Sequence, residues 1–291
     1  MARPLLCLDG WLIALRLKGC SPKTIRKNED TVRRFISAIG ETSEIDEITT
    51  QDIRRYLSER QRGLAPSSLH TERSVLHTFF QFCKAEDLID LNPVDKVASI
   101  IIPKRLIPIL PIEVIKGLLS ICDESSFLGA RNRAIILTFL DTGVRRSELC
   151  RMKRADVFKE AIIIMGKGNK ERYVRISPRT QKAIWRYLVF RRDDLPNLWL
   201  TEERRPLQSE GIRMMIDRLT DRAGITDYKV SAHVFRHTYA TEMLRLGVDE
   251  RSLQAFLGHS TSAMTRRYTE QFSSLDALRL HQVSPVDSMG L

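Results

Sequence analysis

The sequence predicts a mainly α-helical protein with one small β-hairpin, divided into two domains. Over most of the chain, apolar residues recur at helical spacing behind capping residues. Prolines cluster within residues 93–111 and predict a stiff, extended connector, because proline cannot continue a helix. Two short runs rich in Ile and Val flank a glycine-containing turn, which predicts a hairpin. We therefore expect a helical domain at residues 1–100, a proline-rich linker at 101–110 and a second domain at 111–291.

The first domain is expected to be a bundle of four or five helices. Its first helix carries an apolar stripe of Leu8, Leu12 and Leu15, to which Ile13 could be added. Ser21 followed by Pro22 is a typical N-cap for the second helix. Thr49 with Asp52 three residues later resembles a capping box before the third helix, and a further proline begins the fourth.

The second domain combines helices with the predicted hairpin. Strands are expected at 161–165 and 172–176, joined through a loop that contains Lys167. Helices are expected at 112–122, 131–140, 178–192, 208–223, 231–246, 249–257 and 261–271.

The charge of the chain favours a polyanionic partner. The formal net charge is +11. Residues 1–100 hold 15 Lys and Arg against 14 Asp and Glu. The excess of positive charge therefore lies in the second domain, although a solvated cationic surface would give the same charge alone.

Cysteines and apolar runs bear on the compartment. The five cysteines are scattered and form no C-x-x-C pair, which argues against disulfide or structural zinc frameworks and favours a reducing compartment. No apolar run approaches the roughly 18–20 residues of a membrane span. We expect a cytoplasmic protein with no membrane partner.

Six residues of the second domain could together transfer a phosphodiester to a protein nucleophile. Guanidiniums suit the negative charge that gathers on the non-bridging oxygens of the transition state, because each donates two hydrogen bonds in a fixed fork. A lysine could protonate the leaving 5′ oxygen, and a tyrosine could attack phosphorus. Histidines titrate near neutral pH and could transfer protons to or from the phenol and the phosphate. The candidates are Arg145, Lys167, His233, Arg236, His259 and Tyr268.

This chemistry needs no cofactor. A phosphotyrosine ester conserves the energy of the broken bond, and the loop around Lys167 lacks the spacing of a nucleotide-binding P-loop. His233 and His237 have the i, i+4 spacing of zinc ligands, but the accompanying Glu and a third ligand are absent. We therefore expect no metal ion, and we expect His237 to pack or to cap. Taken singly, Lys167 could be an ordinary hairpin lysine and Tyr268 a core aromatic.

The order of these motifs resembles the tyrosine recombinase, or phage integrase, family, and most closely its Xer-type site-specific recombinases. The motifs are residues 142–149 (TGVRRSEL), 166–172 (GKGNKER), 233–237 (HVFRH), 257–259 (LGH) and Tyr268. The resemblance implies that the six candidates are catalytic, that Tyr268 forms a 3′-phosphotyrosyl link to DNA, and that Glu148 supports the site by orienting another group.

The resemblance also implies an architecture and partners. Residues 1–100 would be a helical, SAM-like core-binding domain and residues 111–291 a mixed α/β catalytic domain, which together form a C-shaped clamp on double-stranded DNA. A tail helix after Tyr268 would dock on a neighbouring copy within a tetramer on two DNA sites, or fold back on its own domain. The reaction would serve DNA integration and excision or chromosome dimer resolution through a Holliday junction, with or without a second recombinase as partner.

Two other functions remain open at this point. A type IB topoisomerase-like enzyme uses the same chemistry, but the leucine-bearing tail and the two-domain layout argue against it. A DNA-binding accessory protein would need neither Lys167 nor Tyr268.

Overall fold

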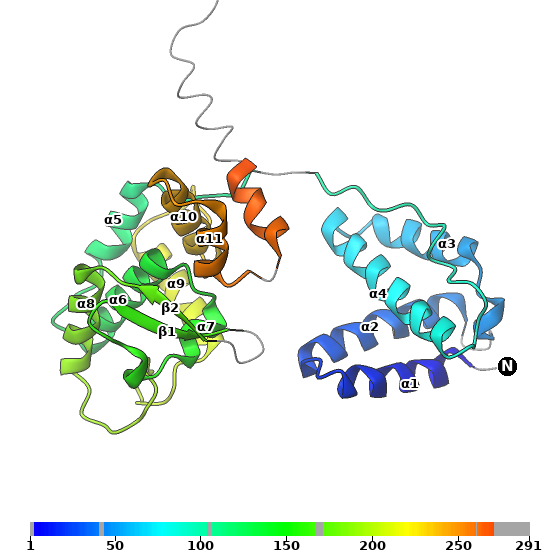
Figure 1. Ribbon diagram of the computed structural model, residues 1–291, viewed down its shortest axis with the longest axis horizontal. Helices are drawn as coiled ribbons and strands as arrows, with labels where there is room; N and C mark the ends of the chain where they lie inside the picture. The colour runs from blue at the N-terminus through cyan, green and yellow to red at the C-terminus, as the bar shows by residue number, and fades with distance from the viewer. Residues whose placement is uncertain (1–2, 41–43, 104–105, 167–170, 260, 271–291) are drawn as a thin grey trace, which may run out of the picture. The chain divides into compact units, whose positions relative to one another are not determined.

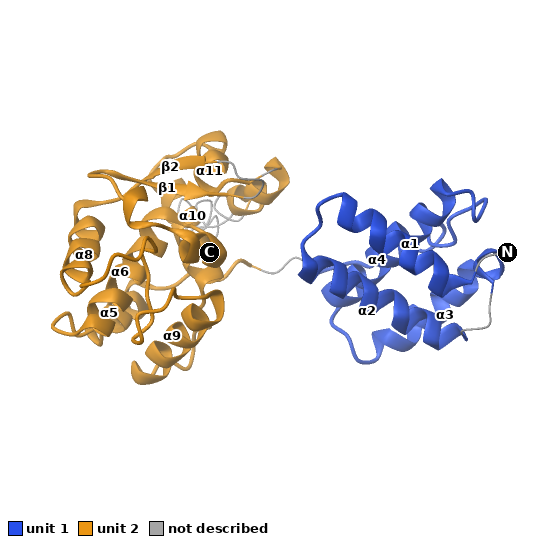
Figure 2. Cartoon of the chain, turned by 90° about the horizontal axis from the view of Figure 1, so that it is seen from below, with its two compact units in different colours: residues 1–105 blue, residues 106–291 orange. Residues whose placement is uncertain are grey.

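The computed structural model describes all residues except 1–2, 41–43, 104–105, 167–170, 260 and 271–291. The chain divides into two compact units, Met1–Arg105 and Leu106–Leu291 (Figure 2). Within the described residues, the fold is mainly helical with one two-stranded antiparallel sheet, as the sequence predicts. No described helix is long and apolar enough to cross a membrane.

The first unit is a helical bundle whose helix starts follow from the sequence. The Ser21 hydroxyl accepts a hydrogen bond from the backbone of Thr24, and Thr49 and Asp52 form the predicted capping box. Helices α1, α2 and α4 contact one another around a core that contains Trp11. The helices are α1 (Pro4–Leu17), α2 (Pro22–Ile39), the 3₁₀ turn η1 (Ile45–Glu47), α3 (Thr50–Gln61) and α4 (Pro66–Ala85).

One expectation for α1 is wrong. Ile13 is 55% exposed, whereas Leu8, Trp11 and Leu12 are buried. Each residue advances about 100° around a helix, so the buried positions share one face and residue 13 lies on another. Leu8, Leu12 and Leu15 are buried as predicted, and Trp11, which was not included in the stripe, lies on the same buried face.

The second unit places helices around the small sheet (Figure 1). Strand β1 (Ala161–Met165) agrees with its prediction, and β2 (Glu171–Arg175) lies one residue earlier than predicted, with Ile163 opposite Tyr173. The helices are α5 (Ile112–Ser120), α6 (Phe127–Thr142), α7 (Arg146–Arg151), the 3₁₀ turn η2 (Arg154–Asp156), α8 (Pro178–Val189), α9 (Ser209–Arg222), α10 (Ala232–Arg245) and α11 (Glu250–Leu257).

Two helices differ from the sequence prediction near the candidate site. Helix α6 begins four residues before the predicted start because Ser126 caps it, and it ends at Gly143 in the left-handed conformation. The short helix α7 follows at once and was not predicted. A last described helix spans residues 262–270, close to the predicted 261–271.

The second unit has two apolar clusters. The larger one is formed mainly by α5, α6, α8, α9 and the sheet. A smaller cluster joins α10 and α11 to the helix at 262–270, with Tyr268 inside it. Because α10 also contacts α6, it connects the smaller cluster to the rest of the unit.

Candidate active site

A pocket of about 240 Å³ in the second unit brings together five of the six predicted catalytic residues. Lys167, the sixth, lies outside the described residues. Five segments of the chain contribute: the segment before α5, the start of α7, helix α10, the turn after α11 and the helix at 262–270. The residues that line the pocket are Ile107, Arg145, His233, Arg236, His237, His259, Ala263, Met264, Arg267 and Tyr268.

Helix α10 presents three of these residues on one face. The Ser231 hydroxyl accepts a hydrogen bond from the backbone of Val234 and fixes the first turn. His233, Arg236 and His237 follow at spacings of three and one, and positions i, i+3 and i+4 are neighbours on a helix surface. One helical turn therefore supplies a guanidinium and two imidazoles to the pocket.

Arg236 is the buried cation of the pocket. Its side chain is only 2% exposed, and its terminal nitrogens donate to the carbonyls of Gly143 (2.7 Å) and Leu257 (2.8 Å). Burial, with repulsion from Arg145, lowers the pKa of Arg236 to about 10. The guanidinium stays charged at neutral pH, so a fixed positive charge lies beneath the pocket.

Arg145 reaches the pocket from the turn between α6 and α7. Gly143 makes this turn with a φ of +57°, and a Cβ atom there would lie 2.3 Å from Cδ1 of Tyr239. Nη1 of Arg145 donates to Oε1 of Glu148 (2.9 Å), and Nη2 donates to the Gly258 carbonyl (3.3 Å). Both contacts fix the direction of a partly exposed guanidinium.

Glu148 is a buried carboxylate between two arginines. It is 3% exposed, and Arg172 donates to it from Nη2 at 2.8 Å while Arg145 donates from its backbone and its side chain. Burial favours the neutral carboxyl, but the hydrogen bonds from Arg172 and Arg145 outweigh it and lower the pKa of Glu148. Arg172 received no role from the sequence. Its position at the end of the 166–172 motif was the signal that could have identified it.

His259 is held by a hydroxyl group. It follows Gly258, which ends α11 with a left-handed φ of +63°, and its Nδ1 lies 2.8 Å from Oγ1 of the buried Thr265. Burial and the nearby guanidiniums lower the pKa of His259 to about 4, so the ring is neutral at pH 7. Thr265 could not be identified from the sequence, because nothing in its spacing distinguishes it from the other hydroxyl-bearing residues of that helix.

Tyr268 is packed inside the smaller apolar cluster. It is 5% exposed, and its hydroxyl lies 2.7 Å from Nδ1 of His237. Burial raises the pKa of Tyr268, although the positive charges of Arg236 and Arg267 oppose this effect. The phenol is therefore protonated at neutral pH.

The two histidines of α10 have different environments. His233 is exposed, and partial loss of hydration with the charges of Arg236 and Arg145 lowers its pKa. His237 is half-buried, with its ring centroid 4.4 Å from that of His233. The expectation that His237 only packs or caps is incomplete, because it contacts the hydroxyl of Tyr268. Among the described residues, no group of three His, Cys, Asp or Glu side chains is placed to hold a metal ion.

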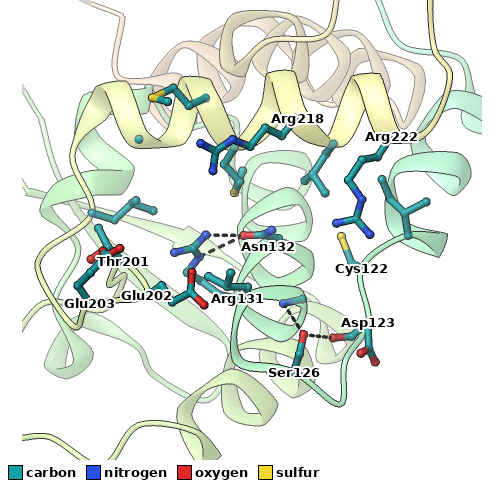
Figure 3. Close-up of a pocket in the computed structure, with 18 residues that line it drawn as sticks. Cys122, Asp123, Ser126, Arg131, Asn132, Thr201, Glu202, Glu203, Arg218 and Arg222 are labelled. Carbon is teal, nitrogen blue, oxygen red and sulfur yellow. Dashed lines mark hydrogen bonds between the residues drawn. The ribbon is translucent and has the colours of Figure 1, made fainter.

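A larger pocket of about 750 Å³ lies between the start of α6 and α9 (Figure 3). None of the five described candidates lines it. Its buried Arg131 donates to the Leu200 carbonyl (2.7 Å) and to Oδ1 of Asn132. The bond to Leu200 ties α6 to the segment before α9, which gives this arginine a structural role.

Comparisons with known proteins agree with this geometry. Residues 109–274 match the model of the phage integrase family, and residues 8–87 match the model of the phage integrase N-terminal SAM-like domain. The tyrosine recombinase XerC of Bacillus pumilus is 32% identical over 276 residues, covering 90% of each chain. The tyrosine recombinase XerA of Thermococcus onnurineus is 34% identical over 264 residues, covering 88% of this chain and 87% of XerA.

Solved structures have a similar fold. The match to a crystal structure of XerA recombinase spans 97% of this chain and 99% of the XerA chain, with 28% identity and a TM-score of 0.53. The match to the XerH site-specific recombinase bound to palindromic difH substrate spans 91% of this chain and 80% of the XerH chain, with 21% identity and a TM-score of 0.73. Together with the matched family models, these similarities place the chain in the phage integrase family, among the Xer-type tyrosine recombinases, which are DNA strand-transferring enzymes.

Proposed function

We propose that the chain cleaves and rejoins double-stranded DNA at specific sites through a 3′-phosphotyrosyl intermediate on Tyr268. The observation that carries this proposal is the single pocket that Tyr268 shares with Arg145 and Arg236. The tyrosyl ester retains the energy of the broken phosphodiester, so rejoining requires no nucleotide cofactor. Paired exchanges of this kind proceed through a Holliday junction.

The two arginines would hold the reacting phosphate. Their planar guanidiniums donate in forks to the two non-bridging oxygens and stabilise the charge that develops in the transition state. Burial holds the charged side chain of Arg236 in one position, and a hydrogen bond to Glu148 holds the side chain of Arg145. Glu148 thus acts as a supporting residue that does not itself touch DNA.

The remaining candidates would handle protons and hydrogen bonds. His233 and His259 would donate hydrogen bonds to the phosphate. In His259 the Thr265 hydroxyl contacts Nδ1, so the other ring nitrogen, Nε2, would be the one that donates. Lys167 would protonate the leaving 5′ oxygen. Its place between β1 and β2 supports this role, since β2 also carries Arg172 close to Glu148.

The first unit would contribute DNA binding. A pocket with a volume of about 500 Å³ lies between the starts of α2 and α4. It carries the exposed cations Lys23, Arg26 and Lys27 on one face of α2, with hydroxyl groups from α4 beside them. Cations and hydroxyls are the groups that contact DNA phosphates. We accordingly propose core binding by residues 1–100, a linker at 101–110 and catalysis by 111–291.

Removing this positive charge is expected to weaken DNA binding with little sequence dependence. The triple variant Lys23→Ala, Arg26→Ala, Lys27→Ala keeps good helix formers at exposed positions, so the bundle should stay folded. The slope of log Kd against log salt should decrease by roughly 0.9 for each phosphate that the variant no longer neutralises. The control is Arg213→Ala, whose charge is already paired with Glu210 and Asp217. An unchanged salt slope in the triple variant would place the DNA contacts elsewhere.

Assembly and biological role are also proposals. A homotetramer on two DNA sites, joined by docking of residues 271–291 on a neighbouring copy, would allow paired strand exchange in the cytoplasm. Those residues lie outside the described part of the chain. The similarity to XerC and XerA supports both integration or excision and chromosome dimer resolution, with or without a second recombinase.

The proposed chemistry is tested with nicked suicide DNA, from which the cleaved end is lost so that the covalent intermediate accumulates. We expect a protein–DNA adduct that forms equally well in EDTA, because guanidiniums supply the charge that a metal ion would otherwise provide. Adduct formation is measured by denaturing gel electrophoresis with and without added magnesium. A strict magnesium requirement for the chemical step would contradict the mechanism.

A further inference from the structure

A buried tyrosine is a poor nucleophile unless another group takes its proton. Burial raises the pKa of Tyr268, so the phenolate is scarce at neutral pH. The proposed function, on which this inference rests, assigns a proton donor to the leaving oxygen but no acceptor for the phenolic proton. The structure offers three imidazoles in the pocket: His233, His237 and His259.

Geometry distinguishes the three imidazoles. Nδ1 of His237 lies 2.7 Å from the Tyr268 hydroxyl, with the two ring centroids 5.4 Å apart. Nδ1 of His259 is occupied by Thr265, and its ring lies parallel to that of Tyr268 with the centroids 6.3 Å apart. Among the described residues, His237 is therefore the imidazole within hydrogen-bonding distance of the hydroxyl oxygen.

We propose that His237 accepts the phenolic proton of Tyr268 during attack on DNA and returns it during rejoining. In cleavage, the O–H bond of Tyr268 breaks and its proton moves to Nδ1 of His237. The oxygen forms a bond to phosphorus, the bond from phosphorus to the 5′ oxygen breaks, and that oxygen takes a proton from the donor that the proposed function assigns. In rejoining, the 5′ hydroxyl gives its proton back to the group that donated it during cleavage, and its oxygen forms a bond to phosphorus. The bond from phosphorus to the tyrosyl oxygen breaks, and that oxygen recovers its proton from His237.

The surroundings of His237 keep it in the form that can accept a proton. Burial lowers its pKa to about 4, and the same direction is favoured by His233 and Arg236 on α10 and by Arg267 on the last described helix. The ring is neutral above that pKa, so at pH 7 it is neutral. For Nδ1 to accept from the hydroxyl, the ring proton must lie on Nε2.

The transfer must occur together with formation of the bond to phosphorus. The free phenol is a much weaker acid than protonated His237, so transfer before attack is unfavourable. As the oxygen bonds to phosphorus it loses electron density and its proton becomes acidic. Negative charge on the reacting phosphate also favours a protonated His237, because opposite charges attract in a poorly hydrated pocket.

The decisive variant is His237→Asn. An asparagine oxygen can accept a hydrogen bond from the Tyr268 hydroxyl but cannot take its proton. We expect single-turnover adduct formation on suicide DNA at pH 7 to slow by about 10²–10³-fold with unchanged DNA binding. The rate of the variant should rise tenfold per pH unit between pH 6 and 9, as the phenolate becomes more abundant, whereas the wild-type rate should show no such rise.

The matched control is His77→Asn, which changes a histidine of the first unit that pairs with Asp95. Its rate and pH profile should equal those of the wild type. A second test places a fluorinated, more acidic tyrosine at position 268. This change should increase the rate of adduct formation more in the His237→Gln variant than in the wild type. This pair replaces His237→Asn if melting curves show that the asparagine variant does not fold.

The outcomes separate this inference from the proposed function. A His237→Asn enzyme with the wild-type rate and pH profile would overturn the role of His237 while leaving Tyr268 as nucleophile. An absence of any adduct in the wild type would instead overturn the proposed function. A slow adduct that still forms on Tyr268 and is accelerated by high pH supports both.

Discussion

Tyr268→Phe is expected to abolish the covalent protein–DNA adduct while leaving DNA affinity unchanged. The substitution removes one oxygen atom, which is the proposed nucleophile, and no other described group in the pocket carries a hydroxyl positioned beside His237. The phenyl ring keeps its place in the smaller apolar cluster. Removal of the hydrogen bond changes the free energy of unfolding by only about 1 kcal/mol, so the variant should remain folded.

Tyr239→Phe is the matched control for this experiment. Tyr239 is also 5% exposed, belongs to the same apolar cluster and lies on α10. Burial raises its pKa to about 12. It does not line the candidate pocket, so its hydroxyl should be dispensable for cleavage. Adduct formation by Tyr268→Phe on suicide DNA, detected by denaturing gel electrophoresis, would show that another residue attacks the phosphate.

Local sequence signals predicted much of the fold because they act within a few residues. The caps at Ser21 and Thr49 are contacts over three positions, and both are present. The cap at Ser126, which was not recognised, explains why the start of α6 was predicted four residues too late. Helix α7 is only six residues long, too short for an apolar period to be visible.

The candidate site was predicted in part, and the missing residues share a physical reason. Motif spacing identified residues that could act on a phosphate, and five of them line one pocket. The contacts of Glu148 with Arg172 and of His237 with Tyr268 join residues 24 and 31 positions apart. Such contacts depend on how α10, β2 and the last described helix pack, which local patterns do not specify. The roles assigned to Lys167 and to the tail remain predictions.

Arg236→Gln is expected to reduce the rate of adduct formation by at least about 10²–10³-fold, the cost of losing one preorganised donor to a developing charge. The larger part of this effect should appear in the chemical step rather than in DNA affinity, because a single buried charge adds little to binding through many phosphates. Arg236→Lys should fall between the wild type and Arg236→Gln, because it retains the charge but loses the planar fork. Single-turnover cleavage and equilibrium binding are measured on the same suicide DNA.

Stability must be separated from catalysis in this variant, since Arg236 also donates to the carbonyls of Gly143 and Leu257. Leaving both carbonyls without donors costs about 1–3 kcal/mol each, so a lower melting temperature is expected. Arg131→Gln is the control, because Arg131 is a second buried arginine that donates to a backbone carbonyl but lies outside the pocket. It should lower stability while the folded fraction cleaves at the wild-type rate. If both variants lost cleavage only in proportion to their folded fractions, Arg236 would be a structural residue and the phosphate would have to be held by other cations.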